Sequence, residues 1–424
     1  MKRRWLWILS GLIVAGVAIG VVVTRAHSAE DERALQEQIR LARAEGLPTN
    51  WREYAATIKT AAPAENAASL YRQLRGKFAK GDPVQLNAEL LFQPGGKSRP
   101  AAGAFLEKNK EALDLVDKAT GLPRCWFDRD WSQASAVLLP EYGYMKGAAR
   151  IVSVRASFKA CQGDPNSALG DVERLFAMAR HVREEPSIIS HVTGMAIYSM
   201  GLRDLAYWTF LFRDEPRYRL ALGRAIDDMP RPDLKAETSD NLFMVLDLVD
   251  SSLTPAGRRH LGVREDDVPA FAKLVPRFAN QARARAAVVE AERDYRLAMG
   301  YKTAQRKTRA DSAREKLDSA LQSFPVAASL YEALFGTEDP AVVRMQMFES
   351  SRLEWIAVWR ALKNPSIPRS IKTSDLLSPF DGKPLTYSFD GKQIVVTVSG
   401  GSGETKPTPL KIPPDRVPGK SSKP

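Results

Sequence analysis

The stretch "ARIVSVRASFKACQGDPNSALGDVERLFAMARHV", residues 149–182, decides the fold class. Small and apolar residues recur at helical spacing on both sides of Gly163-Asp164-Pro165, a turn that ends one helix and starts another. In the second helix one apolar stripe is formed by Ala168, Val172, Leu175, Phe176 and Ala179. The pattern predicts a helical hairpin of tetratricopeptide type, although the period of about 34 residues typical of such repeats is not clearly repeated.

Helical patterns extend outward from this hairpin. The apolar stretch 186–212 contains His191, Arg203 and Asp204, so it is predicted to be a central core helix rather than a membrane span. Helices are also expected over 30–45, 101–119, 276–324 and 340–362, and the Gly- and Pro-rich residues 81–100 are predicted to be a loop. Residues 26–370 thus form a mostly α body of antiparallel helical hairpins, with a subdomain break near residue 230, where Pro230 and Pro232 interrupt the pattern.

The first residues predict a membrane anchor. Lys2, Arg3 and Arg4 precede the uncharged run Trp5–Thr24, which has about the 20 residues that a spanning helix needs. Basic residues tend to stay in the cytoplasm. Residues 1–25 are therefore a cytoplasmic stub and transmembrane helix of the bacterial inner membrane, with the body exported to the periplasm.

Two alternatives about this segment stay open. The small residues around Ala26-His27-Ser28 also fit a cleaved signal peptide, but the apolar run is longer than usual for one. Gly16 and Gly20 form a GxxxG pattern, which in a spanning helix favours dimerisation. Oligomeric state is otherwise not determined by the sequence.

The C-terminal residues 371–401 predict a small β-hairpin. Asp390-Gly391 lies between two β-prone runs, and a two-residue turn there pairs Tyr387 with Ile394. The same pairing places four apolar side chains on one face: Leu385, Tyr387, Ile394 and Val396. We expect this face to dock on the last helix as a structural cap, because an isolated hairpin is marginal in water. The Pro-, Lys- and Ser-rich residues 402–424 are predicted to be a disordered tail.

No catalytic, cofactor-binding or metal-binding residues can be assigned from motifs. The stretch Leu91–Ser98, "LFQPGGKS", lacks the first glycine of a phosphate-binding loop. The four histidines lack zinc-site spacing, and His181 and His191 fit structural roles on core helices. Two acid pairs fit surface positions better than a catalytic site: Asp128 with Asp130, and Asp227 with Asp228. Ser402 lies in a flexible Gly-rich segment rather than a nucleophile turn.

Charge favours acidic partners. The 424 residues include 62 Lys and Arg against 50 Asp and Glu, a formal net charge of +12. The basic cluster Lys302–Arg314 has no interleaved aromatic residues for base stacking, so nucleic acid is not the expected partner. An acidic polymer or an envelope protein is the expected one. Cys125 and Cys161 are the only cysteines, and whether they pair is left open.

Several stretches carry a resemblance. These are "RAEGLPTNWREY", "PAENAASLY", "LPRCWFDRDW", "ACQGDPNSALGDVERLFAMARHVREEPSIISHVTGMAI" and "LLSPFDGKPLTY". Their order and co-occurrence resemble a group of uncharacterised, membrane-anchored helical proteins of planctomycetes and related bacteria, which implies the same architecture and no known activity. The unit "PFDGKPLTYSFDGK" is similar to the C-terminal β segment of type II secretion major pseudopilins, but Ser378 and a single Glu404 replace its acidic calcium loop.

The sequence therefore predicts a non-enzymatic scaffold or binding protein of the bacterial cell envelope. The alternative is a hydrolase that acts on an envelope polymer through carboxylates that the sequence does not identify. A pocket with convergent acids would favour the hydrolase, and a broad binding surface would favour the scaffold.

Overall fold

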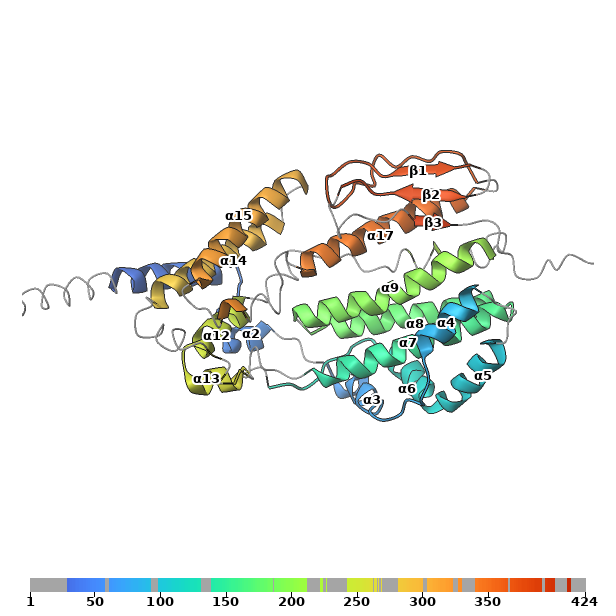
Figure 1. Ribbon diagram of the computed structural model, residues 1–424, viewed down its shortest axis with the longest axis horizontal. Helices are drawn as coiled ribbons and strands as arrows, with labels where there is room; N and C mark the ends of the chain where they lie inside the picture. The colour runs from blue at the N-terminus through green and yellow to red at the C-terminus, as the bar shows by residue number, and fades with distance from the viewer. Residues whose placement is uncertain are drawn as a thin grey trace, which may run out of the picture.

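The computed structural model describes residues 29–57, 61–92, 98–130, 139–185, 187–211, 222–223, 226, 242–261, 263–264, 266, 268, 281–299, 303–322, 327–329, 340–364, 367–390, 393–400 and 410–412. The chain is mostly helical and carries one small antiparallel sheet near its C-terminus (Figure 1). The predicted α class with a terminal β unit is confirmed.

The N-terminal part consists of short elements. A helix covers residues 29–44, and the elements that follow it are α2 (Trp51–Thr57), the 3-10 helix η1 (Pro63–Glu65), α3 (Ala68–Arg72), α4 (Pro83–Phe92), α5 (Ser98–Lys108) and α6 (Lys110–Thr120). The first helix ends at Gly46, whose φ of 75° lets the Leu47 amide reach back to the Ala42 carbonyl at 2.9 Å. Asn50 caps α2 by accepting from the Glu53 amide at 3.1 Å, as the Asn-x-x-Glu spacing indicates.

Three long helices form the centre of the molecule: α7 (Pro140–Cys161), α8 (Pro165–Arg183) and α9 (Ile188–Leu211). Gly163 adopts a φ of 80° between α7 and α8, and the Asp164 side chain caps α8 by accepting from the Ser167 amide at 3.1 Å. The helical hairpin read from this turn is confirmed, and a tetratricopeptide array is not shown. Gly201 allows α9 to approach α8 closely, because a Cβ there would lie 2.8 Å from the Phe176 ring.

The helix α9 occupies the central position that its all-round apolar pattern predicts. Its Tyr198 ring stacks on Phe176 of α8 at 4.3 Å and meets Phe348 of α17 (Pro340–Leu362) edge-on at 4.5 Å. Trp208 and Trp355 are among the largest fully buried side chains. Figure 1 shows α17 between α9 and the sheet. Stacked rings of this kind contribute beyond the area they bury.

Four further helices lie at the end of the molecule away from α5 (left in Figure 1): α12 (Leu242–Ser252), α13 (Pro255–His260), α14 (Gln281–Met299) and α15 (Thr303–Leu321). The helices α14 and α15 pack along one another, so the described part of the helical segment predicted over 276–324 is a pair of helices. Arg293 of α14 donates to Gln38 of the first helix at 2.7 Å and also pairs with Glu45. The predicted break near residue 230 lies outside the described residues.

The terminal sheet has three strands in the order β1 (Thr386–Phe389), β2 (Ile394–Thr397) and β3 (Leu410–Ile412), all antiparallel. The predicted pairing was wrong by two residues, since Tyr387 pairs with Val396 and Phe389 with Ile394. The connection is thus longer than a two-residue turn, and the Asp390 side chain accepts from the Gln393 amide at 2.7 Å within it. Gly391 lies outside the described residues.

The predicted apolar face survives this shift, because moving the register by two residues keeps each side chain on its own face. Leu385, Ile394 and Val396 are buried, and Tyr387 is partly buried. They belong to the same core as Trp355 of α17, on which β2 packs. The prediction of a fully disordered tail needs correction, since residues 410–412 within it form β3 and pair with β2.

Two predictions about the N-terminal part were wrong. Residues 83–92, expected in a loop, form α4, because Asp82 caps the Val84 and Gln85 amides and Pro83 suits a first helical turn. The single helix expected over 101–119 is two helices, α5 and α6. They meet at Asn109, whose side chain is buried. Its Nδ2 donates to the Phe105 carbonyl at 2.8 Å, and its Oδ1 accepts from the backbone amide of Ala79 at 3.0 Å.

Among the described residues, none of the helices has both the length and the apolar composition that crossing a membrane requires. The predicted span Trp5–Thr24 and the glycines Gly16 and Gly20 lie outside the described residues.

Candidate functional site

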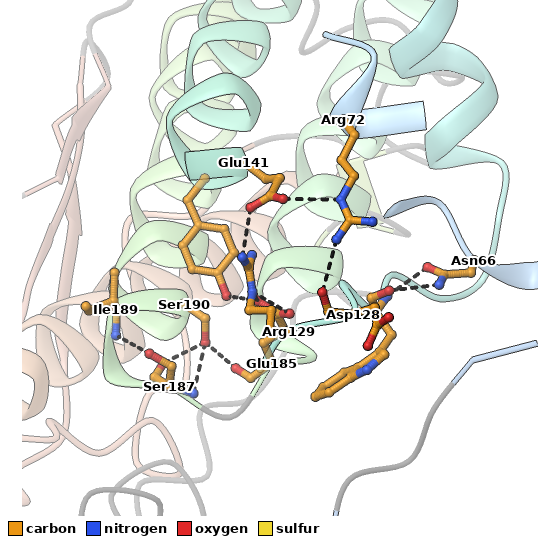
Figure 2. Close-up of polar contacts among 11 residues, drawn as sticks. Asn66, Arg72, Asp128, Arg129, Glu141, Glu185, Ser187, Ile189 and Ser190 are labelled. Carbon is orange, nitrogen blue, oxygen red and sulfur yellow. Dashed lines mark hydrogen bonds and ion pairs between the residues drawn. The ribbon is translucent and has the colours of Figure 1, made fainter. Parts of the chain in front are cut away.

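A buried polar network surrounds Arg129, in the irregular segment that follows α6 (Figure 2). Arg129 Nε donates to both oxygens of Glu185, at 2.9 and 2.8 Å, and its Nη1 donates to Glu141 at 2.8 Å. Its guanidinium also lies over the Phe127 ring at 4.9 Å and the Tyr142 ring at 5.3 Å. One cation therefore joins the start of α7 to the end of α8.

The protonation states in this network follow from burial and charge. Burial, and then the charge of Glu185, raise the pKa of Tyr142, so its hydroxyl keeps its proton and donates to Glu185. Burial opposes ionisation of Glu141, but its hydrogen bonds with its own backbone amide and with Arg129 lower its pKa. Arg72 at the end of α3 adds a second cation at 3.3 Å from Glu141. Every carboxylate in the network is thus neutralised by an arginine.

Side-chain to backbone bonds fix the segment that carries Arg129. Asn66 accepts from the Trp126 amide at 2.8 Å and donates to the Trp126 carbonyl at 2.8 Å (Figure 2). The elements η1 and α3 do not form one continuous helix, because Asn66 is held in extended backbone between them. At the other side of the network, Ser187 caps the Ile189 amide at 3.2 Å where α9 begins.

A second network joins α6, α7 and α8. Arg155 of α7 lies 2.6 Å from Asp117 and 2.7 Å from Asp171, and Lys159 lies 2.8 Å from Asp171. Arg174 of α8 also contacts Asp117 at 2.8 Å. Asp171 is fully buried and surrounded by cations. Both networks pair acids with arginines at helix junctions, which is an arrangement that orients helices rather than one that presents a free acid to a substrate.

A third cluster joins α4, α7 and α9. Ser153 donates to Asp204 at 2.6 Å, and the Asn87 amide donates to Ser153 at 2.8 Å and to Asp204 at 3.2 Å. Arg203 approaches Asp204 at 3.5 Å. Burial raises the pKa of Asp204 to about 6, so this carboxyl titrates well above the ordinary range.

The residues singled out by motif lie apart from one another. His181 contacts Tyr71 OH at 2.9 Å and the Leu122 carbonyl at 3.0 Å, and burial lowers its pKa to about 4. The partner of His181 Nε2 is the Leu122 carbonyl, which can only accept, so Nε2 carries the proton. His181 Nδ1 therefore accepts from the Tyr71 hydroxyl. His191 is buried in α9, where burial lowers its pKa to about 3. Asp128 is exposed.

The remaining residues considered for a catalytic or metal site either do not form a cluster or lie outside the described residues. Cys125 and Cys161 are both free thiols, and Cys161 Sγ lies 3.4 Å from the Leu90 carbonyl. Within the described ranges, no three His, Cys, Asp or Glu side chains gather closely enough to hold a metal ion. The positions His27, Lys97, Asp227, Asp228 and Ser402 lie outside the described residues, and so does the His260 side chain.

One surface pocket of about 650 Å³ lies where the last turn of α17 meets the segment that leads into the sheet. Its lining residues are Arg360, Asn364, Pro368, Ser370, Ile371, Lys372 and Asp375. Arg360 Nη1 and Nη2 donate to the two oxygens of Asp375 at 2.8 and 2.6 Å, and Nη1 also donates to the Lys372 carbonyl at 3.2 Å. The pocket is open, polar and basic, so it is suited to holding a charged group from outside.

Sequence reasoning missed this pocket. The signal available was the basic run "PRSIKTSD", residues 368–375, at the start of the C-terminal β unit. Its two cations, Arg369 and Lys372, match no motif, so only the packing of this segment beside α17 shows that Lys372 shares a recess with Arg360.

The chain has no detectable match among models of protein families, among curated proteins or among solved structures. The geometry of its own residues therefore carries the functional argument.

Proposed function

We propose that this protein is a membrane-anchored, exported helical scaffold or binding protein of the bacterial cell envelope that acts without catalysis. The observation that carries the proposal is the contrast between two kinds of polar site. The acids that lie close together, in the networks of Arg129 and Arg155, are paired and lie at helix junctions. The open pocket beside α17 presents cations and small polar groups instead.

This contrast matters because a hydrolase of polymers needs an acid and a base that reach the substrate. The pocket lining contains one carboxylate, Asp375, and it is held in the fork of Arg360. A binding recess needs only complementary charge and shape. The hairpin of α7 and α8 resembles one tetratricopeptide unit in its helix–Gly-Asp–helix pattern, and it packs on α9, which in turn contacts α17.

The anchor is proposed from sequence. Lys2, Arg3 and Arg4 before the run Trp5–Thr24 favour a cytoplasmic N-terminus and an exported body. A reporter enzyme fused after Pro424 should be active only in the exported compartment, and activity in the cytoplasm would overturn this localisation. A mature protein that begins near Ala29 would identify a cleaved signal peptide instead. Substituting Gly16 and Gly20 with Ile should weaken self-association if the anchor dimerises through them.

Binding is tested by crosslinking in the native membrane. A photoreactive residue at Ile371, inside the pocket, should capture an envelope partner, and the same residue at the exposed Val84 of α4 serves as the matched control. Equal capture from both positions would argue against a specific site. Turnover of an envelope polymer by the purified chain would overturn the non-enzymatic proposal in favour of the hydrolase.

A further inference from the structure

The ion pair between Arg360 and Asp375 has the geometry by which proteins recognise carboxylates. Two parallel N–H groups of the guanidinium meet the two carboxylate oxygens at 2.8 and 2.6 Å. The hydrogen bond with Arg360 lowers the pKa of Asp375 to about 2, so the pair is ionised at any ordinary pH. Yet the Asp375 side chain is 55% exposed, and exposed pairs of this kind are weak.

Further cations lie in the same part of the chain, and one of them, Lys372, lines the pocket beside the pair. Lys363, Arg369 and Lys372 are all exposed, and no described carboxylate forms an ion pair with Lys372 or Arg369. Lys363 is held over the Trp359 ring at 5.2 Å, which keeps it at the end of α17. The surroundings of Arg360 thus carry more positive charge than the single carboxylate of Asp375 balances.

The pocket supplies polar and apolar contacts beside these charges. Ser370 and Asn364 line it together with Pro368 and Ile371. The Asn364 amide donates to the Arg360 carbonyl at 3.2 Å, which leaves its side-chain oxygen to accept from a ligand. Pro368 is fixed by Tyr387 of β1, whose hydroxyl donates to its carbonyl at 3.0 Å. The recess is therefore supported by the sheet as well as by α17.

We propose that this pocket binds an acidic peptide segment of a partner protein, and that Asp375 occupies the fork of Arg360 until a ligand carboxylate displaces it. The inference rests on the proposed function and names the chemistry of its ligand. The ligand carboxylate takes the place of Asp375 on Arg360, and Lys372 pairs with a second acid of the same segment. Asp375 then moves into solvent, which is a small change for an exposed side chain.

A peptide is favoured over other anions for two reasons. The group now in the fork is itself the side chain of an aspartate, held in a turn of the chain, so the geometry already accepts the carboxylate of a peptide side chain. In addition, Pro368 and Ile371 give the recess apolar contacts that suit a peptide side chain, whereas sugar rings usually stack on aromatic residues, which the lining lacks.

The test measures binding of a labelled hexa-aspartate peptide to the full chain purified in detergent, by fluorescence anisotropy at low and at physiological salt. Asp375→Asn should tighten binding about five-fold, because it removes the internal competitor without removing a cation. Arg360→Gln should weaken binding about ten-fold or more, and Lys372→Gln by a few-fold. Circular dichroism of each variant checks that the fold is retained, and Lys372→Gln alters only an exposed side chain.

Two control variants separate local from general charge effects. Asp114→Asn removes another exposed carboxylate of an ion pair, and Lys383→Gln removes another exposed lysine. Both should leave affinity nearly unchanged. Equal tightening in Asp375→Asn and Asp114→Asn would overturn the displacement mechanism, because net charge alone would explain it.

Other outcomes also contradict the proposal. Affinity that is insensitive to Arg360→Gln would place the peptide elsewhere. Binding of an oligogalacturonate but not of the peptide would make the ligand an acidic polysaccharide. Binding of neither would show that the pocket is not an anion site, whereas crosslinks from position 371 and the membrane topology would still support the proposed function.

Discussion

Arg129 and Glu185 form a buried ion pair in which the Arg129 side chain is 5% exposed and the Glu185 side chain is 1% exposed. Their nearest atoms, Nε of Arg129 and Oε2 of Glu185, lie 2.8 Å apart. The pair joins an irregular segment to the end of α8, so it holds together two parts of the chain that no helix connects. The first prediction follows from this burial.

Arg129→Met should lower the free energy of unfolding by about 3–5 kcal/mol, because it leaves the buried carboxyl of Glu185 without its main partner. The double variant Arg129→Met/Glu185→Met should recover much of this loss, since it removes both charges together. Denaturant unfolding of the unsubstituted protein, the two single variants Arg129→Met and Glu185→Met, and the double variant measures the coupling energy between the two side chains. Arg40→Met is the matched control, because Arg40 pairs with Glu37 at the surface and its loss should leave stability nearly unchanged.

The Asp204 carboxyl should make stability depend on pH. Its folded pKa of about 6 lies above the ordinary value of 3.8, so folding favours the protonated form. The resulting stabilisation is complete below about pH 4 and is lost as the pH rises through 6, a change of about 3 kcal/mol. Unfolding measured between these pH values should show this slope, and Asp204→Asn should flatten it. An unchanged slope in that variant would assign the effect to other groups.

Asn66 should be required for the path of the segment after α6. Its side chain satisfies both the amide and the carbonyl of Trp126, each at 2.8 Å. Asn66→Ala should destabilise the fold by about 1–3 kcal/mol for each group left unsatisfied. Asn66→Asp keeps the acceptor and loses the donor, so its stability should lie between those of the unsubstituted protein and Asn66→Ala. Thermal unfolding checks both, and Asn166→Ala at the exposed start of α8 should have little effect.

The C-terminal sheet should act as a stabilising cap on α17. Ile394 is fully buried in the core that includes Trp355, so Ile394→Ala should cost about 2–5 kcal/mol. Ser388→Ala, on the exposed face of β1, should change stability little. The cap interpretation predicts that binding at the pocket falls only in step with folding. If Ser388→Ala abolished binding while stability stayed the same, the sheet would instead be a recognition surface.

Some elements could be predicted because their signals are local. The hairpin of α7 and α8 follows from apolar spacing and from Gly163-Asp164-Pro165, and the structure has these residues in the expected cap. The face of β1 and β2 was predicted correctly with the wrong register, because alternation specifies the face and the turn specifies the register. The helix α4 was missed because flanking Gly and Pro residues outweighed the Asp82 cap.

The sequence by itself determined the helical class, the central position of α9, the apolar face of the terminal strands and the positively charged, apolar start of the chain. Each of these depends on residues within a few positions of one another, where periodicity and capping act. Only the tertiary structure decided that Arg129 meets Glu185, that Asn66 holds Trp126, and that Arg360 and Asp375 share a pocket. Charged and amide side chains have many possible partners in an unfolded chain, and the packing of the helices selects a few of them.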